Sequence, residues 1–182
     1  LIEFISERGR IPASTEYLLP EEFRDQVGTV RQAFRILKQL SDDNQWELIA
    51  SEKSKDLLVY LALAKFDGRP KFSDLPSDIK FDVKAFFKSY KLACQTSDEL
   101  MFSLSDQDIL SEALLFAPVG KLTRSALYIH ESALHLSNPM IRVYEGCGRS
   151  LVGRVEGANI VKLRRDEPKV SYLTYPEFES DP

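Results

Sequence analysis

Through the first 116 residues of this 182-residue chain, apolar side chains recur every three or four positions. That spacing puts them on one face of each α-helix, and such a face is stable only when it is buried against another element. Capping residues, glycines and prolines interrupt the pattern at short intervals and mark the helix ends. Few residues remain between one expected helix and the next, so the loops are short. These residues are therefore expected to form a helical bundle with short connections.

Three short helices are expected first. The helix over residues 1–8 stops at Gly9, and another starts afresh at Pro20, because proline breaks a preceding helix but suits the first turn of the next. Gly28 then precedes a helix over residues 30–40. Three short helices with a glycine turn before the third resemble a helix-turn-helix arrangement.

The other expected helices begin at side chains that can accept hydrogen bonds from the free N–H groups of a first turn. They run from Asp42 or Asp43 to Phe66, from Ser77 to Cys94, from Asp106 to Leu115 and from Asn138 to Leu151.

Two stretches near the C-terminus alternate between faces as β-strands do. They cover residues 159–165 and 169–175 and flank Asp166-Glu167-Pro168. An isolated hairpin is marginal in water, so this one must pair with further strands or lie on a helical face. The expected fold is α+β and predominantly α-helical. It comprises a helical bundle with a helix-turn-helix-like N-terminal part and a C-terminal β-hairpin or small antiparallel sheet.

Three sequence segments follow from these patterns: a three-helix part (1–40), a helical part (41–116) and a mixed part (117–182). They are expected to pack as one compact unit. Because the chain opens inside an amphipathic pattern and without methionine, it is expected to be cut from a longer protein; a processed chain is the alternative.

The charge is distributed unevenly along the chain. The whole sequence carries a formal charge of −4, but residues 117–170 hold nine basic and five acidic side chains. Residues 41–116 hold nine basic and fourteen acidic ones. A mildly acidic total therefore conceals a basic segment, which is the kind of asymmetry that suits polyanion binding.

Several protein classes are disfavoured by composition. No apolar run approaches the roughly 20 residues that span a bilayer, and the N-terminus lacks the features of a secretory signal. We therefore expect a cytoplasmic protein without a membrane partner. Two cysteines, Cys94 and Cys147, are too few for a disulfide framework or a structural zinc site.

His130 and His135 lie five residues apart, without a cysteine or acidic residue at ligand spacing, so no metal site is expected. A hydrogen-bonded, structural His130 is the favoured interpretation. A hydrolase built around it stays open as the alternative.

Residues 143–150 (VYEGCGRS) imitate the glycine-rich loop of nucleotide- and S-adenosylmethionine-binding sheets. However, the surrounding pattern is helical, and Asn138-Pro139 is a helix start. Only 32 residues follow Ser150, which is too few for the rest of such a sheet. We therefore expect no catalytic or cofactor-binding residue in this segment.

Two basic groupings are candidate nucleic-acid-binding sites. Arg31, Arg35 and Lys38 share one face of the third helix, where a groove-reading helix exposes cations to phosphates. A solvated amphipathic helix looks the same, so both interpretations stay open.

The hairpin supplies the second grouping, in which cations are interleaved with aromatic residues as in sites that contact phosphates and stack bases. Its members are Lys162, Arg164, Arg165 and Lys169, with Tyr172 and Tyr175 nearby. The alternative is a basic strand edge that discourages sheet aggregation.

Six stretches across nearly the whole chain resemble one bacterial family, the DNA phosphorothioation-associated methyltransferase-like proteins. They are residues 4–12 (FISERGRIP), 55–63 (KDLLVYLAL), 85–91 (AFFKSYK), 126–134 (ALYIHESAL), 142–147 (RVYEGC) and 169–176 (KVSYLTYP). The resemblance implies that a domain binding S-adenosylmethionine lies upstream in the parent protein. This chain corresponds to the region that follows it, so no family cofactor or catalytic residue carries over to a position here.

Three functional hypotheses result. The first is an accessory region that contacts or positions DNA for the upstream methyltransferase domain of the same parent chain. The second is a protein-interaction module that docks other DNA-modification proteins of a bacterial defence system and does not itself bind DNA. The third is a self-sufficient enzyme.

Overall fold

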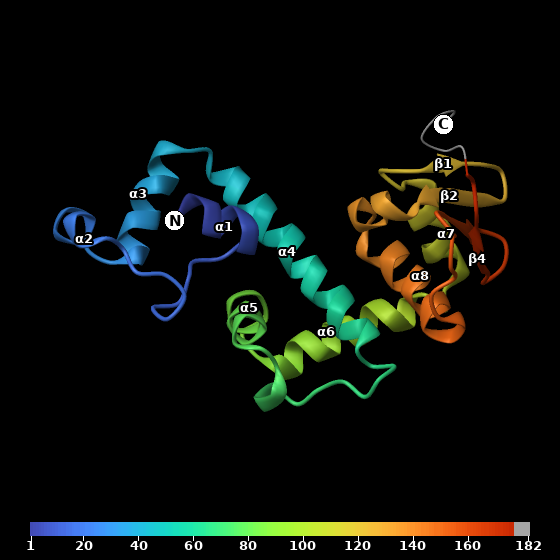
Figure 1. The fold of residues 1–182 in the computed structure, drawn as a ribbon, viewed down its shortest axis with the longest axis horizontal. Helices are drawn as coiled ribbons and strands as arrows, with labels where there is room; N and C mark the ends of the chain where they lie inside the picture. The colour runs from blue at the N-terminus through green and yellow to red at the C-terminus, as the bar shows by residue number, and fades with distance from the viewer. Residues whose placement is uncertain (177–182) are drawn as a thin grey trace. The chain divides into compact units, whose positions relative to one another are not determined.

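We describe the protein from a computed structural model that defines residues 1–176, apart from the side chain of Asp43. The helices of this part of the chain are α1 (Ile2–Arg8), α2 (Glu21–Val27), α3 (Val30–Leu40), α4 (Asp43–Leu63), η1 (Phe72–Asp74), α5 (Ser77–Phe87), α6 (Tyr90–Ser103), α7 (Gln107–Leu115), η2 (Glu131–Leu136) and α8 (Pro139–Val152), of which η1 and η2 are 3₁₀ helices (Figure 1). The strands are β1 (Lys121–Leu122), β2 (Ala126–His130), β3 (Ile160–Arg164) and β4 (Val170–Leu173). The expected α+β, predominantly α-helical fold is confirmed.

Contacts group the chain into two compact units. Unit 1 comprises Leu1–Leu57 and Pro70–Ala93, and unit 2 comprises Leu58–Arg69 and the residues from Cys94 onward. Helices α4 and α6 each contribute residues to both units. This grouping does not follow the three sequence segments, which stay predictions.

The helix-turn-helix-like part of unit 1 consists of α1, α2 and α3. Helix α1 ends where Gly9 adopts a left-handed φ of 68° and donates its N–H to the carbonyl of Ile5. A residue with a Cβ is strained in this conformation, which is why glycine suits the helix end. Gly28 and Thr29 join α2 to α3, and Gly28 also has a positive φ.

A buried ion network anchors the N-terminal residues of unit 1 to α5. The Arg10 side chain is 4% exposed and donates two hydrogen bonds of 2.7 Å to Glu16 and another to Asp82. Arg8 bridges Asp82 and Asp78 at 2.9 Å each. Buried charges are tolerated only when they are paired in this way, so the network fixes the path of the chain after α1.

Unit 2 contains the sheet. Its strands follow the order β1-β2-β3-β4, and each neighbouring pair is antiparallel. The predicted hairpin is therefore β3-β4. It pairs with further strands, as expected because an isolated hairpin is only marginally stable in water. Strands β1 and β2 lie in a region for which no strand was predicted.

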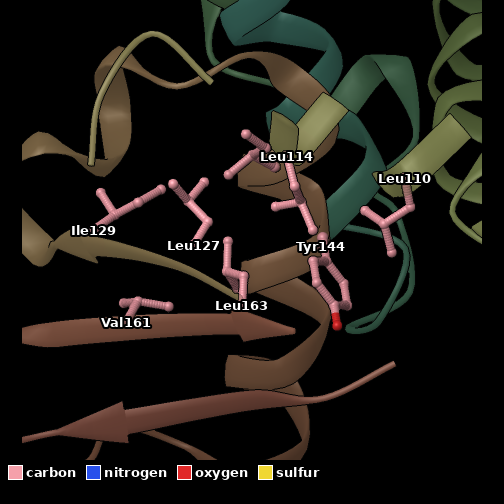
Figure 2. Close-up of a cluster of buried hydrophobic side chains, with 8 residues drawn as sticks. Leu110, Leu114, Leu127, Ile129, Tyr144, Val161 and Leu163 are labelled. Atoms are coloured by element: carbon pink, nitrogen blue, oxygen red, sulfur yellow. The ribbon is translucent and has the colours of Figure 1, made fainter. Parts of the chain in front are cut away.

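Helices α7 and α8 pack on one face of this sheet (Figure 2). The close-up shows the side chains of α7, β2, α8 and β3 converging on one cluster. It is formed by Leu110, Leu114, Leu127, Ile129, Ile141, Tyr144, Val161 and Leu163, none more than 6% exposed. The buried positions of β3 alternate, so Ile160, Lys162 and Arg164 belong to the other face.

The Gly-Cys-Gly sequence lies inside α8, as the helical pattern predicted. A Cβ built on Gly146 would come within 2.5 Å of the Leu63 side chain, and one on Gly148 within 2.9 Å of Val170 Cβ. The two glycines therefore allow close packing of α8 on its neighbours. These residues do not fit a cofactor loop, because their backbone is helical and the space beside it is filled.

The single helix predicted from Ser77 to Cys94 is wrong, because it is interrupted at Lys88. Lys88 has a φ of 61°, and Ser89 begins α6 by accepting a hydrogen bond from the Leu92 N–H. The apolar spacing continues across this break, which is why periodicity alone missed it.

Candidate nucleic-acid interface

Helix α3 is held in place by its own cap and by one small contact surface. Thr29 and Gln32 form a capping box, in which each side chain accepts a hydrogen bond from the other residue's backbone N–H. Ala33 is buried, and the Phe34 ring meets the Trp46 ring of α4 edge-on at 5.6 Å. The opposite side of α3 stays accessible.

The three cations predicted on this helix do lie on α3, at the spacing of one helical face. Arg31 and Arg35 are exposed, and Lys38 is half-buried. Neither arginine makes a side-chain hydrogen bond or ion pair within the described part of the chain. The sequence of α3 contains no acidic residue, so this face is positively charged.

Arg31 also stands beside two hollows of unit 1. One of them, which we call the α3 cleft, has a volume of about 550 Å³. Its lining comes from α1, the residues just after it, α3, α4 and α5. A second pocket of about 580 Å³ is lined by Arg31 together with residues 12–14 and 17–19, Arg24 and the α2–α3 connection.

The hairpin cations are engaged differently. Arg164 pairs with Asp166 at 2.6 Å and with Glu167 at 3.5 Å. The hydrogen bond to Asp166 raises the pKa of Arg164, and the same bond lowers the pKa of Asp166. Arg165 donates to Ser111 Oγ at 3.2 Å, so its side chain ties the hairpin to α7. Among the predicted hairpin cations, Lys169 is exposed.

The aromatic partner of Lys162 differs from the predicted one. Lys162 lies opposite Tyr128 in the β2–β3 register, with its ammonium 5.3 Å from the centre of that ring. Tyr172 belongs to the other face, where its hydroxyl donates to the Glu145 carbonyl at 3.3 Å and Arg149 covers its ring at 4.6 Å. The predicted grouping of Tyr172 with the hairpin cations is therefore wrong.

Lys121 and Tyr128 lie in one cross-strand row with the predicted cation Lys162. Neither of the two was among the predicted candidate residues. Lys121, Tyr128, Lys162 and Ser171 are cross-strand neighbours in the four strands. The alternation of Leu127 and Ile129 with Tyr128 and His130 in the sequence of β2 was the available signal. It is short, and no turn motif marks it.

Two other reactive side chains, those of His130 and Cys147, lie in unit 2. The His130 side chain caps η2, because its Nδ1 accepts a hydrogen bond from the Ser132 N–H. The same nitrogen lies 2.7 Å from Ser132 Oγ. Burial raises the pKa of the Cys147 thiol, so it is a weak nucleophile. Within residues 1–176, no cluster of three or more His, Cys, Asp and Glu side chains could hold a metal ion.

No family model, curated protein or solved structure matches this chain. Among the described helices, none combines the length and apolar character needed to cross a membrane.

Proposed function

We propose that this chain is a nucleic-acid-contacting region that binds the DNA backbone through α3. The observation that carries the proposal is the acid-free face of α3, on which the exposed Arg31 and Arg35 have no side-chain partner among the described residues. Other arginines of unit 1, such as Arg8 and Arg10, are already paired with carboxylates. An arginine without an internal partner keeps its full capacity to bind a phosphate.

The family resemblance supplies the context of the proposal. In that context the chain handles DNA for a methyltransferase domain upstream in the same cytoplasmic parent protein, and S-adenosylmethionine binds in that domain. The packing of Gly146 and Gly148 supports the assignment of S-adenosylmethionine binding to the upstream domain. The one glycine-rich sequence of this chain is used for helix packing instead of for a cofactor loop.

Fluorescence anisotropy with a labelled duplex tests the proposal. Phosphate contacts release counterions, so binding must weaken as salt is raised from about 50 mM to about 200 mM. Each phosphate contact contributes about 0.9 to the slope of log K against log salt, so R31E/R35E should lower that slope by about 1.8.

A matched control changes the charge of unit 1 by the same amount. Lys71 and Lys91 are exposed and lie outside α3, so K71E/K91E should retain most of the affinity and of the salt slope. Equal losses for the two double variants, or no duplex binding at low salt, would reject α3 as the interface.

A second candidate function is a protein-interaction module of a DNA-modification system. It is favoured by a shallow hollow of about 400 Å³ in unit 2, lined by Leu100, Ile109, Phe116 and Met140 among others. Phe116 is 72% exposed there, which is costly for an aromatic side chain without a partner. Partners retained after nuclease treatment but lost in F116S, together with no intrinsic DNA affinity, would favour this function over the first.

A further inference from the structure

We infer that the α3 cleft binds a single nucleotide, with its base against the aromatic wall and its phosphate against the cations at the rim. The inference rests on the proposed function in one respect, the source of that nucleotide. If the chain binds a nucleic acid, the nucleotide is an unpaired position of that nucleic acid. A free mononucleotide has the same chemistry, and the experiment below separates the two.

The size of the cleft suits such a ligand. Its volume of about 550 Å³ lies within the range of roughly 300 to 1,000 Å³ that is typical of small-molecule sites. Gly9, Pro12, Ala13 and Ala50 are among the small residues of its lining.

Four aromatic rings from α3, α4 and α5 contribute to the wall. They belong to Phe34, Trp46, Phe81 and Phe86. The Trp46 ring is fixed, because its Nε1–H donates to Ser41 Oγ at 2.7 Å and Phe34 packs against it edge-on. Rigid aromatic surfaces stack nucleobases with little dependence on their sequence.

The charge at the cleft favours an anion. Arg31, Lys38 and Lys84 line it together with one carboxylate, that of Glu47. Arg10 also lines it, but Glu16 and Asp82 already neutralise that guanidinium. Among these cations, Arg31 of α3 and Lys84 of α5 make no ion pair with another described residue.

Lys84 is the most informative of these cations. It is exposed on α5, and its ammonium lies 5.9 Å from the Phe72 ring, a contact weak enough to be exchanged for a phosphate. Because Lys84 is not on α3, its replacement separates nucleotide binding in the cleft from duplex binding on the helix face.

Isothermal titration calorimetry on the full 182-residue chain tests the inference with three probes: dAMP, deoxyadenosine and inorganic phosphate. We expect dAMP to bind at least tenfold more tightly than either of the others, because only dAMP engages both the aromatic wall and the cations. Equal affinities for dAMP and phosphate, or no dAMP binding, would overturn the inference.

Surface substitutions then locate the site without disturbing the fold. Lys84→Gln should weaken dAMP binding at least fivefold, whereas Glu47→Gln should strengthen it because a competing carboxylate is removed. Lys91→Gln, which removes an exposed cation outside the cleft, is the control and should change nothing. Unchanged dAMP affinity in both cleft variants would refute the assignment to this cleft.

The source of the nucleotide is decided by comparing a paired duplex with the same duplex carrying one unpaired adenine. Tighter binding of the second duplex that is lost in Lys84→Gln supports a nucleic-acid source. Arg35 does not line the cleft. Arg35→Glu should therefore weaken duplex binding and leave dAMP binding intact, so the failure of one proposal is distinguishable from the failure of the other.

Discussion

Replacing Arg10 with methionine should destabilise unit 1 severely. The Arg10 side chain is 4% exposed and satisfies Glu16 and Asp82, whose side chains are 15% and 12% exposed. Methionine fills similar space but leaves Glu16 without its guanidinium and Asp82 with Arg8 as its remaining described cation. The substitution therefore tests a buried charge rather than a cavity.

The expected magnitude follows from breaking a buried ion pair, which costs about 3 to 5 kcal/mol because the remaining charge is left without compensation. For a chain of 150–250 residues, each kcal/mol lowers Tm by about 2 to 4 °C, so the expected loss is about 6 to 20 °C. Burial alone would lower the pKa of Arg10, but the hydrogen bonds of Glu16 and Asp82 outweigh it and raise that pKa. The same partners that raise this pKa are the ones that lose their cation in Arg10→Met.

Thermal unfolding followed by circular dichroism measures the effect. Arg8→Met is the matched control, because Arg8 joins the same network but is 29% exposed, and it should lose less than half as much. A triple variant, R10M/E16Q/D82N, should recover part of the loss because it removes the stranded charges as well. A Tm for Arg10→Met within about 2 °C of the wild type, or equal losses in the two single variants, would refute the reasoning.

Three further predictions concern stability. The hydrogen bond from Arg10 holds the pKa of Glu16 below its ordinary value. This stabilisation is complete above about pH 4.3 and is lost as the pH falls through the lower folded value, so Glu16→Gln should reduce Tm at pH 7 and flatten its decline in acid. A wild-type-like acid profile in that variant would contradict this. Gly148→Ala should cost up to about 2 kcal/mol in urea unfolding, because overpacking against Val170 outweighs the gain in helix propensity. Val170→Ala should relieve part of that cost, because it removes the two Cγ atoms at 3.0 and 3.2 Å but keeps the Cβ atom at 2.9 Å. A stabilised Gly148→Ala variant would contradict the packing role. Leu163→Ala, at a fully buried position, should cost about 2 to 5 kcal/mol, and a loss below 1 kcal/mol would mean that the cluster is loosely packed.

Much of the helical framework was predictable because its ends carry local chemistry. Gly9 ends α1, Thr29 begins α3, Asp106 caps α7, and Asn138 caps α8, each through contacts within a few residues. Such signals are legible in a sequence because they do not depend on distant parts of the chain.

The rest depends on contacts that no local pattern encodes. The β2–β3 register decides that Tyr128, rather than Tyr172, accompanies Lys162. The α3 cleft exists because residues of α1, α3, α4 and α5 converge, and their sequence separation hides that convergence. The cations of α3 were predictable from helical spacing, but their lack of internal partners was not.

The division of α4 and α6 between the two units has a consequence for truncated and substituted variants of this chain. Each unit is assembled from two stretches of sequence with residues of the other unit between them, so a single terminal deletion that keeps one unit whole also keeps a piece of the other. During synthesis, unit 1 remains unfinished until Ala93 has left the ribosome, even though its first 57 residues emerge early. A proline placed near the junction of Leu57 and Leu58 would interrupt α4 and thereby destabilise both unit 1 and unit 2.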